Sequence, residues 1–218
     1  MNKITTVIFD MDGVISDTQS AHSRIEQDIL GEYGIRMDAA EITRRFAGVT
    51  GREMFPKIFS EYGVELPDIE GVLQDKWRRM QQVAAEGISE IPGVASLIRD
   101  LHANRFRLGV ASGSRLAFIE LVLSALNLAD YFHAVSSSQE VERGKPDPAI
   151  FLLAAKKLGA KPGECLVIED AESGMLAAKG AGMKCVGLVL DRQRSYPADM
   201  VIENFGELSV ERIRDLEA

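Results

Sequence analysis

Acidic side chains follow two short apolar segments of the chain, and their types and spacing could do chemistry. Asp10 and Asp12 come directly after the first apolar segment, and Glu169 and Asp170 come directly after a later one. Four carboxylates at one place would repel one another strongly unless a hard divalent cation lay among them. Mg²⁺ suits an all-oxygen site and takes few protein ligands together with waters and phosphate oxygens. These residues therefore predict a Mg²⁺ site.

A hydroxyl and an ammonium group stand where they can complete such a site. Ser112, followed by Gly113, ends another apolar segment, and Lys145 lies in the polar segment Arg143–Pro148. Taken singly, the serine is an ordinary turn residue and the lysine an ordinary surface residue. Beside a bound cation, however, a hydroxyl and an ammonium group can hold a phosphoryl group. The combination favours chemistry on a small phosphorylated metabolite.

The elements that must position these side chains are short buried strands. The apolar segments 6–9, 108–111, 134–135, 166–168 and 185–189 are continuous rather than alternating, which is typical of strands covered on both faces. Helical patterns stand between most of them. This alternation predicts a Rossmann-like, doubly wound parallel sheet, that is, an α/β fold. Ligands bind such sheets beyond the carboxyl ends of the strands, where the polar residues stand.

One long segment departs from the alternation. Residues 20–86 carry one helical pattern after another and no convincing strand, and Ile91-Pro92-Gly93 marks the return to the sheet. The length of 218 residues is also about 1.5 times that of a typical domain. We therefore predict an α/β core domain of residues 1–17 and 89–218, and an inserted all-α cap domain of residues 18–88.

Composition excludes several classes of partner and location. Hydrophobic residues make up 46% of the chain, enough for a core, and the formal net charge is −8, which argues against a nucleic acid or an anionic membrane as the main partner. No apolar stretch approaches the roughly 20 residues of a membrane span, and Asp10 stops the first apolar run too early for a signal peptide. Cys165 and Cys185 stand in apolar segments with no disulfide framework. We expect a cytoplasmic protein, and a monomer.

Four segments, in order along the chain, resemble the signatures of the haloacid dehalogenase-like hydrolases, especially their phosphatase and phosphomutase members. They are Phe9-Asp10-Met11-Asp12-Gly13-Val14, Val110-Ala111-Ser112-Gly113-Ser114, Gly144-Lys145-Pro146-Asp147-Pro148 and Ile168-Glu169-Asp170-Ala171-Glu172-Ser173-Gly174. The resemblance runs over about residues 4–205, and the helical insertion stands where this family has its small cap domain.

The resemblance implies roles for the acidic residues. Asp10 would be the nucleophile that forms an aspartyl-phosphate. Asp12 would be the general acid and then the base, a role that needs a carboxyl pKa raised toward the working pH. Asp10, the backbone carbonyl of Asp12, and Asp170 would bind the Mg²⁺. Glu169 would either be a further ligand or contact one of these ligands without binding the ion.

The substrate-binding residues implied by the resemblance come from both predicted domains. Ser112, Gly113 and Lys145 of the core resemble the phosphate-binding residues of the family. In the cap, His22 stands where sugar-phosphate members often carry a histidine near the leaving group, although a solvated helix residue remains an alternative. Arg52 is a candidate contact to an anionic ligand, and a solvated helix face explains it equally well.

Other residues receive mainly structural interpretations. Arg44 and Arg45, like Arg52, are either candidate contacts to an anionic ligand or residues of a solvated helix face. His102 near a helix end and His133 beside a strand are expected to be structural, and Trp77 is expected in the core of the cap. Lys76 resembles a phosphate-contacting cap residue of the mutases, but its spacing to Pro92-Gly93 differs, so we do not assign it.

Three functions remain open at the level of the sequence: a Mg²⁺-dependent phosphatase acting on a sugar phosphate or similar metabolite, a β-phosphoglucomutase-like enzyme, and a non-catalytic anion-binding protein. The mutases present an arginine directly after a Gly-Val-Ser segment of the cap. Here Gly48-Val49-Thr50 is followed by Gly51, and Arg52 stands one place late. This departure favours the phosphatase, with the mutase as the alternative. The binding protein ranks last because every signature position holds its catalytic residue type.

Overall fold

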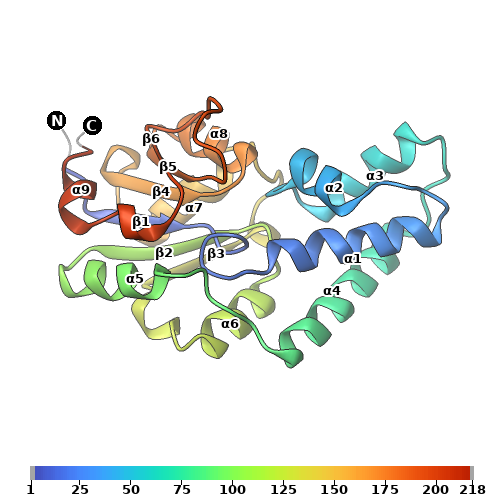
Figure 1. The fold of residues 1–218 in the computed structure, drawn as a ribbon, viewed down its shortest axis with the longest axis horizontal. Helices are drawn as coiled ribbons and strands as arrows, with labels where there is room; N and C mark the ends of the chain where they lie inside the picture. The colour runs from blue at the N-terminus through green and yellow to red at the C-terminus, as the bar shows by residue number, and fades with distance from the viewer. Residues whose placement is uncertain (1–2, 217–218) are drawn as a thin grey trace.

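The computed structural model describes residues 3–216, and a parallel sheet of six strands lies at the centre of this part of the chain (Figure 1). The spatial order is β3-β2-β1-β4-β5-β6, which is the order of a doubly wound Rossmann-like sheet. The predicted fold class is therefore confirmed. The strands are β1 (Thr6–Phe9), β2 (Arg107–Ser112), β3 (Ala134–Ser137), β4 (Cys165–Glu169), β5 (Lys184–Leu188) and β6 (Met200–Ile202).

The register of the central strands brings the ends of three strands to one level. Phe9 of β1 is aligned with Val110 of β2 on one side and with Ile168 of β4 on the other. The backbone N–H of Asp10 donates to the carbonyl of Ile168 at 2.9 Å, which continues the ladder one residue past β1. Polar residues that follow these strands must therefore lie close together.

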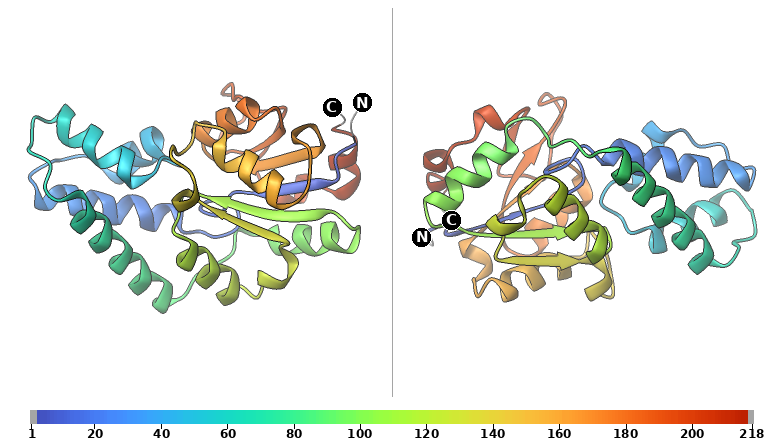
Figure 2. Two further views of the ribbon diagram at one scale, coloured as in Figure 1. Left: turned by 180° about the vertical axis from the view of Figure 1, so that it is seen from behind. Right: turned by 90° about the horizontal axis from the view of Figure 1, so that it is seen from below.

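Both faces of the sheet are covered by helices (Figure 2). Successive side chains of β1 alternate between two hydrophobic clusters: Val7 and Phe9 belong to one and Ile8 to the other. Helices α5 (Val94–Ala103), α6 (Leu116–Ala125) and α9 (Val210–Arg214) contribute to the first cluster, which also contains residues from helices between 19 and 86, and α7 (Ala149–Lys157) and α8 (Glu172–Gly180) contribute to the second. This two-sided burial explains why the strands read as continuous apolar runs.

The 3₁₀ segments of the core are short and lie in its connections. They are η1 (Ala129–Tyr131), η2 (Ser138–Glu140), η3 (Pro162–Glu164) and η4 (Phe205–Glu207).

A group of four helices stands beyond one end of the sheet, and both termini lie at the opposite end of the molecule (Figure 1). These helices are α1 (Gln19–Glu32), α2 (Ala39–Phe46), α3 (Gly51–Glu61) and α4 (Ile69–Glu86); we call them the helical insert. Asp38 caps α2 by accepting from the N–H of Glu41, and Asp68 caps α4 through two such bonds. The interruption of the strand–helix alternation is thus helical, as expected. The division into two domains at residues 18 and 88 stays a prediction.

One strand was not anticipated from the sequence. Strand β6 has only three residues and half-buried side chains at two of them, so it lacks the long apolar run that marks the other strands.

None of the helices within residues 3–216 combines the length and the apolar character that crossing a membrane would require.

Candidate active site

The acidic residues that follow β1 and β4 meet around the side chain of Lys145. Its Nζ lies 2.5 Å from Oδ1 of Asp10 and 2.5 Å from Oε1 of Glu169. Carboxylate oxygens of Asp10, Glu169 and Asp170 lie within 4.8 Å of one another. The structure therefore brings together four residues from three separate places in the sequence, and the register of β1 and β4 accounts for the acidic ones.

Burial and mutual repulsion set the charge state of this cluster. Burial raises the pKa of Asp10 to about 8; Lys145 opposes the rise, while Glu169 and Asp12 add to it. Burial, with Glu169 and Asp10, also holds the pKa of Asp170 well above its usual range. Burial alone would lower the pKa of Lys145, but its two carboxylate partners outweigh that effect and raise it. One ammonium group thus pairs with two buried carboxyl groups and lies near the partly buried carboxyl group of Asp170, and further positive charge would stabilise the cluster.

The donor set fits a hard divalent cation such as Mg²⁺, because every side-chain donor is a carboxylate oxygen. Glu169 is already engaged on both oxygens: Oε1 accepts from Lys145, and Oε2 accepts from the backbone N–H of Ala171 at 2.8 Å. Asp10 and Asp170 are therefore the better placed of the three to bind a cation directly. Glu169 is better placed to hold Lys145.

Two glycines make room for these carboxylates. Gly13 has a φ of +92°, which L side chains rarely adopt, and a Cβ there would overlap the carboxylate of Asp170. Gly174 lies in α8, and a Cβ there would overlap the carboxylate of Glu169. Packing against the carboxylate of Glu169 thus explains why a glycine stands at position 174, the last residue of the fourth signature segment.

The carboxylate of Asp12 points away from this cluster and into a network of hydroxyl groups. Its Oδ2 accepts from Ser112 Oγ at 3.2 Å and from Ser114 Oγ at 2.9 Å, and its Oδ1 accepts from Thr18 Oγ1 at 2.5 Å. His22 Nε2 lies 3.2 Å from the same Oδ1. Only the backbone of Asp12 therefore remains to serve the metal site, as the resemblance implied.

The protonation of Asp12 differs from our expectation. Burial raises its pKa, but the adjacent His22 and the hydrogen bonds from Thr18 and Ser114 outweigh burial and hold the pKa of Asp12 well below its usual range. The general-acid role led us to expect a raised pKa. The expectation was wrong for this arrangement because the sequence did not reveal that His22, Thr18 and Ser114 stabilise the charged form of Asp12.

The remaining predicted phosphate-binding residues lie at the same place. Ser112 is fully buried, and its Oγ donates to Asp12 while accepting from the N–H of Ser114 at 3.0 Å. Gly113 lines a cavity between the sheet and the helical insert. Ser112 thus adjoins Asp12, and Gly113 adjoins the cavity.

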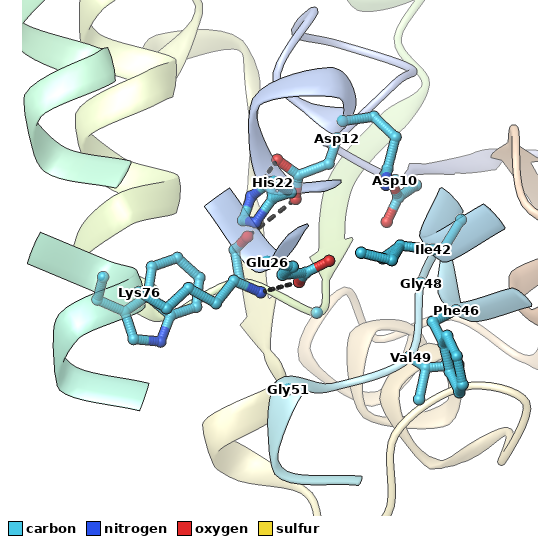
Figure 3. A pocket seen from close by; sticks show the side chains of 15 residues that line it. Asp10, Asp12, His22, Glu26, Ile42, Phe46, Gly48, Val49, Gly51 and Lys76 are labelled. Atoms are coloured by element: carbon cyan, nitrogen blue, oxygen red, sulfur yellow. Dashed lines mark hydrogen bonds and ion pairs between the residues drawn. The ribbon is translucent and has the colours of Figure 1, made fainter. Parts of the chain in front are cut away.

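This cavity joins the carboxylates of the core to side chains of the insert (Figure 3). On the core side it is lined by Asp10, Asp12 and Ser114, among others. From the insert, helices α1, α2 and α4 and the segment 46–51 contribute Gln19, His22, Glu26, Ile42, Phe46, Ala47, Gly48, Val49, Gly51, Lys76 and Trp77. The site is thus shared between the core and the insert.

Aromatic rings pack at the border between the core and the insert. The ring centroid of His22 lies 5.7 Å from that of Trp77 and 6.0 Å from that of Phe118 in α6, both edge to face. His22 is therefore a buried residue at the site, and its alternative interpretation as a solvated helix residue was wrong. Trp77 packs against the hydrophobic core as expected, but it also lines the cavity.

The structure does not bring the predicted arginine contacts to the cavity. Arg52 is exposed, and its guanidinium lies 2.6 Å from Glu70 in α4. Arg45 pairs with Glu41 and Glu61 on the surface of the insert. None of these side chains belongs to the cavity lining found among residues 3–216.

Arg44 is exposed and likewise lies outside the cavity lining. The two other histidines are structural, as expected. His133 Nδ1 accepts from the N–H of Leu108 at 3.2 Å, and His102 packs edge to face on Tyr131.

Sequence reasoning missed two groups of site residues. Thr18 and Ser114 adjoin residues that the motifs singled out, but nothing in the pattern showed that their hydroxyls contact Asp12. Glu26 was not considered; it stands four residues after His22, so a helical wheel of α1 would have placed both side chains on one face. Lys76 was left unassigned.

A doubly wound α/β fold with an aspartate, a lysine and a carboxylate cluster beyond its strand ends is the arrangement that the resemblance led us to expect of a phosphoryl-transfer hydrolase. A family model described as haloacid dehalogenase-like hydrolase matches residues 7–188. The chain belongs to this family, and the resemblance stated from its motifs is confirmed.

Relatives of known activity are phosphatases and phosphomutases. The chain is 34% identical over 215 residues to a β-phosphoglucomutase of Bacillus subtilis, covering 96% of this chain and 93% of the relative. It is 32% identical over 184 residues to a fructose-1-phosphate phosphatase of Escherichia coli, covering 84% and 96%. The protein is accordingly a haloacid dehalogenase-like enzyme of the phosphatase and phosphomutase group.

Solved structures share the whole architecture. A crystal structure of CbbY from Rhodobacter sphaeroides in complex with xylulose-1,5-bisphosphate superposes with a TM-score of 0.85 at 26% identity, covering 96% of this chain and 99% of that one. A β-phosphoglucomutase from Clostridium difficile superposes with a TM-score of 0.86 at 29% identity, covering 97% and 96%.

Proposed function

We propose that the protein is a Mg²⁺-dependent phosphatase that hydrolyses a small phosphorylated metabolite, such as a sugar phosphate, through an aspartyl-phosphate. The observation that carries this proposal is the placement of Asp10. Its carboxylate is held 2.5 Å from Lys145 within a carboxylate cluster and also lines the cavity that leads to the insert. A phosphoryl group in this cavity would meet the carboxylate of Asp10 as a nucleophile, with the ammonium group of Lys145 beside it.

In the first half of the proposed reaction, an Oδ atom of Asp10 attacks phosphorus and the bond from phosphorus to the ester oxygen breaks. The leaving oxygen takes a proton from Asp12. In the second half a water attacks phosphorus, its proton passes to the carboxylate of Asp12, and the bond from phosphorus to Asp10 breaks. The lowered pKa of Asp12 suits this second role, in which it must be charged, and opposes the first role, for which Asp12 must carry a proton.

Lys145, Asp170 and Glu169 support this chemistry without taking part in a bond to carbon or phosphorus. Asp10 and Asp170 would hold the Mg²⁺, which supplies positive charge to offset that of the transferring phosphoryl group. Lys145 orients Asp10, and Glu169 orients Lys145. His22 of the insert would lie beside the leaving group, since its Nε2 already lies 3.2 Å from Asp12.

The alternative is a β-phosphoglucomutase-like reaction, in which the aspartyl-phosphate passes to a sugar hydroxyl rather than to water. The Bacillus subtilis relative supports it. Against it stands the position of Arg52, whose guanidinium lies beside Glu70 on the outer surface rather than at the cavity.

One experiment separates the candidates. The protein is incubated with Mg²⁺ and a panel of sugar phosphates, with and without a sugar bisphosphate as activator, and both free phosphate and isomerised sugar phosphate are measured. We expect phosphate release that EDTA stops, that Asp10→Asn abolishes, and that Asp17→Asn, an exposed aspartate of the same loop, preserves. Isomerisation without phosphate release selects the mutase, and no turnover of any compound selects a binding protein.

A further inference from the structure

A buried ion pair joins the two longest helices of the insert at the wall of the cavity. Lys76 Nζ in α4 lies 2.6 Å from Glu26 Oε1 in α1, and the two side chains are 7% and 8% exposed. Both residues line the cavity that also contains Asp10 and Asp12 (Figure 3). The pair stands on the insert side, so it faces the part of a substrate that is distant from the reacting phosphate.

The fold does not by itself account for this pair. Removing two charges from water is costly, and well-packed apolar residues of similar volume often serve a fold equally well or better. Here the surrounding insert is already tied together by apolar side chains such as Ile29, Leu73 and Met80. A buried pair that opens on a cavity instead suggests that its polar atoms meet a ligand.

Glu26 also decides the charge that Lys76 presents. With its carboxylate 2.6 Å from the ammonium group, Lys76 no longer offers an unbalanced positive charge to an anion. Within the part of the chain that the structure describes, no other lysine and no arginine lines this cavity. Two cations lie over the Trp77 ring, Lys76 Nζ at 5.4 Å and the Arg115 guanidinium at 5.5 Å from its centroid, and Arg115 lies outside the lining.

We infer that the far end of the substrate is uncharged and hydroxylated, and that Glu26 is the residue that selects it over a second phosphate or a carboxylate. This inference rests on the proposed phosphatase function. An ammonium group keeps donors, and a carboxylate keeps acceptor positions, beyond those used in their own pair. Neighbouring hydroxyl groups, which both donate and accept, can satisfy the two partners at once. A second anion would instead meet the carboxylate of Glu26 in a buried site.

Trp77 completes the proposed subsite. It follows Lys76 in α4, lines the same cavity, and is held edge to face against His22. An indole ring offers an apolar surface to the C–H groups of a polyol while the ion pair takes the hydroxyl groups. The fold itself does not dictate whether the far end of the substrate is charged, because CbbY, with a similar fold, was crystallised with a bisphosphate.

The test compares two compounds that differ only at the far end. Glucitol 6-phosphate and gluconate 6-phosphate have the same phosphorylated end and the same length, but carry a hydroxymethyl and a carboxylate group at C1. We expect kcat/KM with Mg²⁺ to be at least about tenfold higher for the glucitol ester, with the difference mainly in KM. Glucitol 1,6-bisphosphate is expected to behave like the gluconate ester.

Variants assign this preference to Glu26. In Glu26→Gln the amide oxygen can still accept from Lys76, but the ammonium charge is no longer balanced, so the preference for glucitol 6-phosphate should fall at least about fivefold or reverse. Glu32→Gln is the matched control: Glu32 also lies in α1 and pairs with α4 through Arg79, but on the exposed surface. It should keep the wild-type ratio. The double variant Glu26→Met with Lys76→Met should lose the preference while keeping the fold.

The outcomes are distinguishable. If the wild type hydrolyses the gluconate ester or the bisphosphate as well as glucitol 6-phosphate, the inference is overturned and the phosphatase proposal stands. An unchanged ratio in a folded Glu26→Gln variant also overturns it, and should that variant not fold, the wild-type ratio and the double variant decide. If no phosphate is released from these compounds or from 4-nitrophenyl phosphate, the phosphatase proposal itself fails.

Discussion

Replacing Asp10 by asparagine should make the metal-free protein more stable while abolishing its activity. Burial raises the pKa of Asp10 from 3.8 to about 8. A carboxyl group whose pKa is raised on folding loses stability as the pH rises from the unfolded pKa to the folded one. Between the unfolded pKa and pH 7 lie roughly 3 pH units. At 1.36 kcal/mol per unit, the charge on Asp10 lowers the free energy of unfolding at pH 7 by at most about 4 kcal/mol.

Asparagine has the size of the carboxyl group without its charge, so it should recover part of this cost. Its amide oxygen can still accept from Lys145, but a neutral acceptor balances the ammonium charge less well than a carboxylate does, and we therefore expect about 2 kcal/mol rather than the ceiling. For a protein of 218 residues, this corresponds to a Tm increase of about 4–8 °C. At pH 5 only roughly 1 pH unit has been crossed, and the gain should shrink to less than half.

The assay is thermal unfolding in EDTA at pH 7 and at pH 5, followed by circular dichroism. Asp17→Asn is the control, since it removes the same charge from an exposed position on the same loop. Added Mg²⁺ should raise the Tm of the wild type more than that of Asp10→Asn, because only the wild type keeps both proposed ligands. A Tm of Asp10→Asn at or below that of the wild type in EDTA, or a gain that does not shrink at pH 5, would refute the reasoning.

Two further predictions concern packing around the site. Gly174→Ala should lower kcat at least about tenfold, because its methyl group displaces the Glu169 carboxylate that holds Lys145; Gly180→Ala in the same helix meets only ordinary contacts and should retain activity, and equal activities of the two would contradict this account. Burial raises the pKa of Cys165 to about 11 and also raises that of Cys185, so a thiol reagent at pH 8 should label neither cysteine until denaturant is added. Rapid labelling of the native protein would show that these strands open readily.

The sequence predicted the residues that regular structure positions. Asp10 and Glu169 could be placed together because parallel strands end at one edge of a sheet, and the register of β1 with β4 bears this out. The Glu26–Lys76 pair could not be found in this way, because its two residues are 50 positions apart in the sequence. No local pattern specifies how their two helices pack. Strand β6 escaped for a different reason: three residues are too few to show a period.

Asp10 and Asp12 show most clearly what spacing alone leaves open. The two carboxylates stand two residues apart, yet the pKa of Asp10 is raised and that of Asp12 is lowered. The difference comes from their neighbours: Asp10 faces other buried carboxylates of the core, whereas Asp12 faces hydroxyl groups and His22. Pairs of acids whose pKa values are pushed apart are typical of sites where one group attacks and the other moves protons.

One of the groups that separate these two pKa values belongs to the insert. His22 lies in α1, and its approach to Asp12 requires the insert to rest against the strand ends. Two hydrogen bonds between a side chain and the backbone tie the insert to the core. Ser173 Oγ donates to the carbonyl of Ala47 at 2.6 Å, and the N–H of Gly144 donates to Glu53 at 3.3 Å. The charge of Asp12 is therefore coupled to the position of the insert. Any movement that withdrew α1 would remove the stabilisation that His22 gives to the charged form of Asp12, the carboxyl group that the proposed reaction uses as acid.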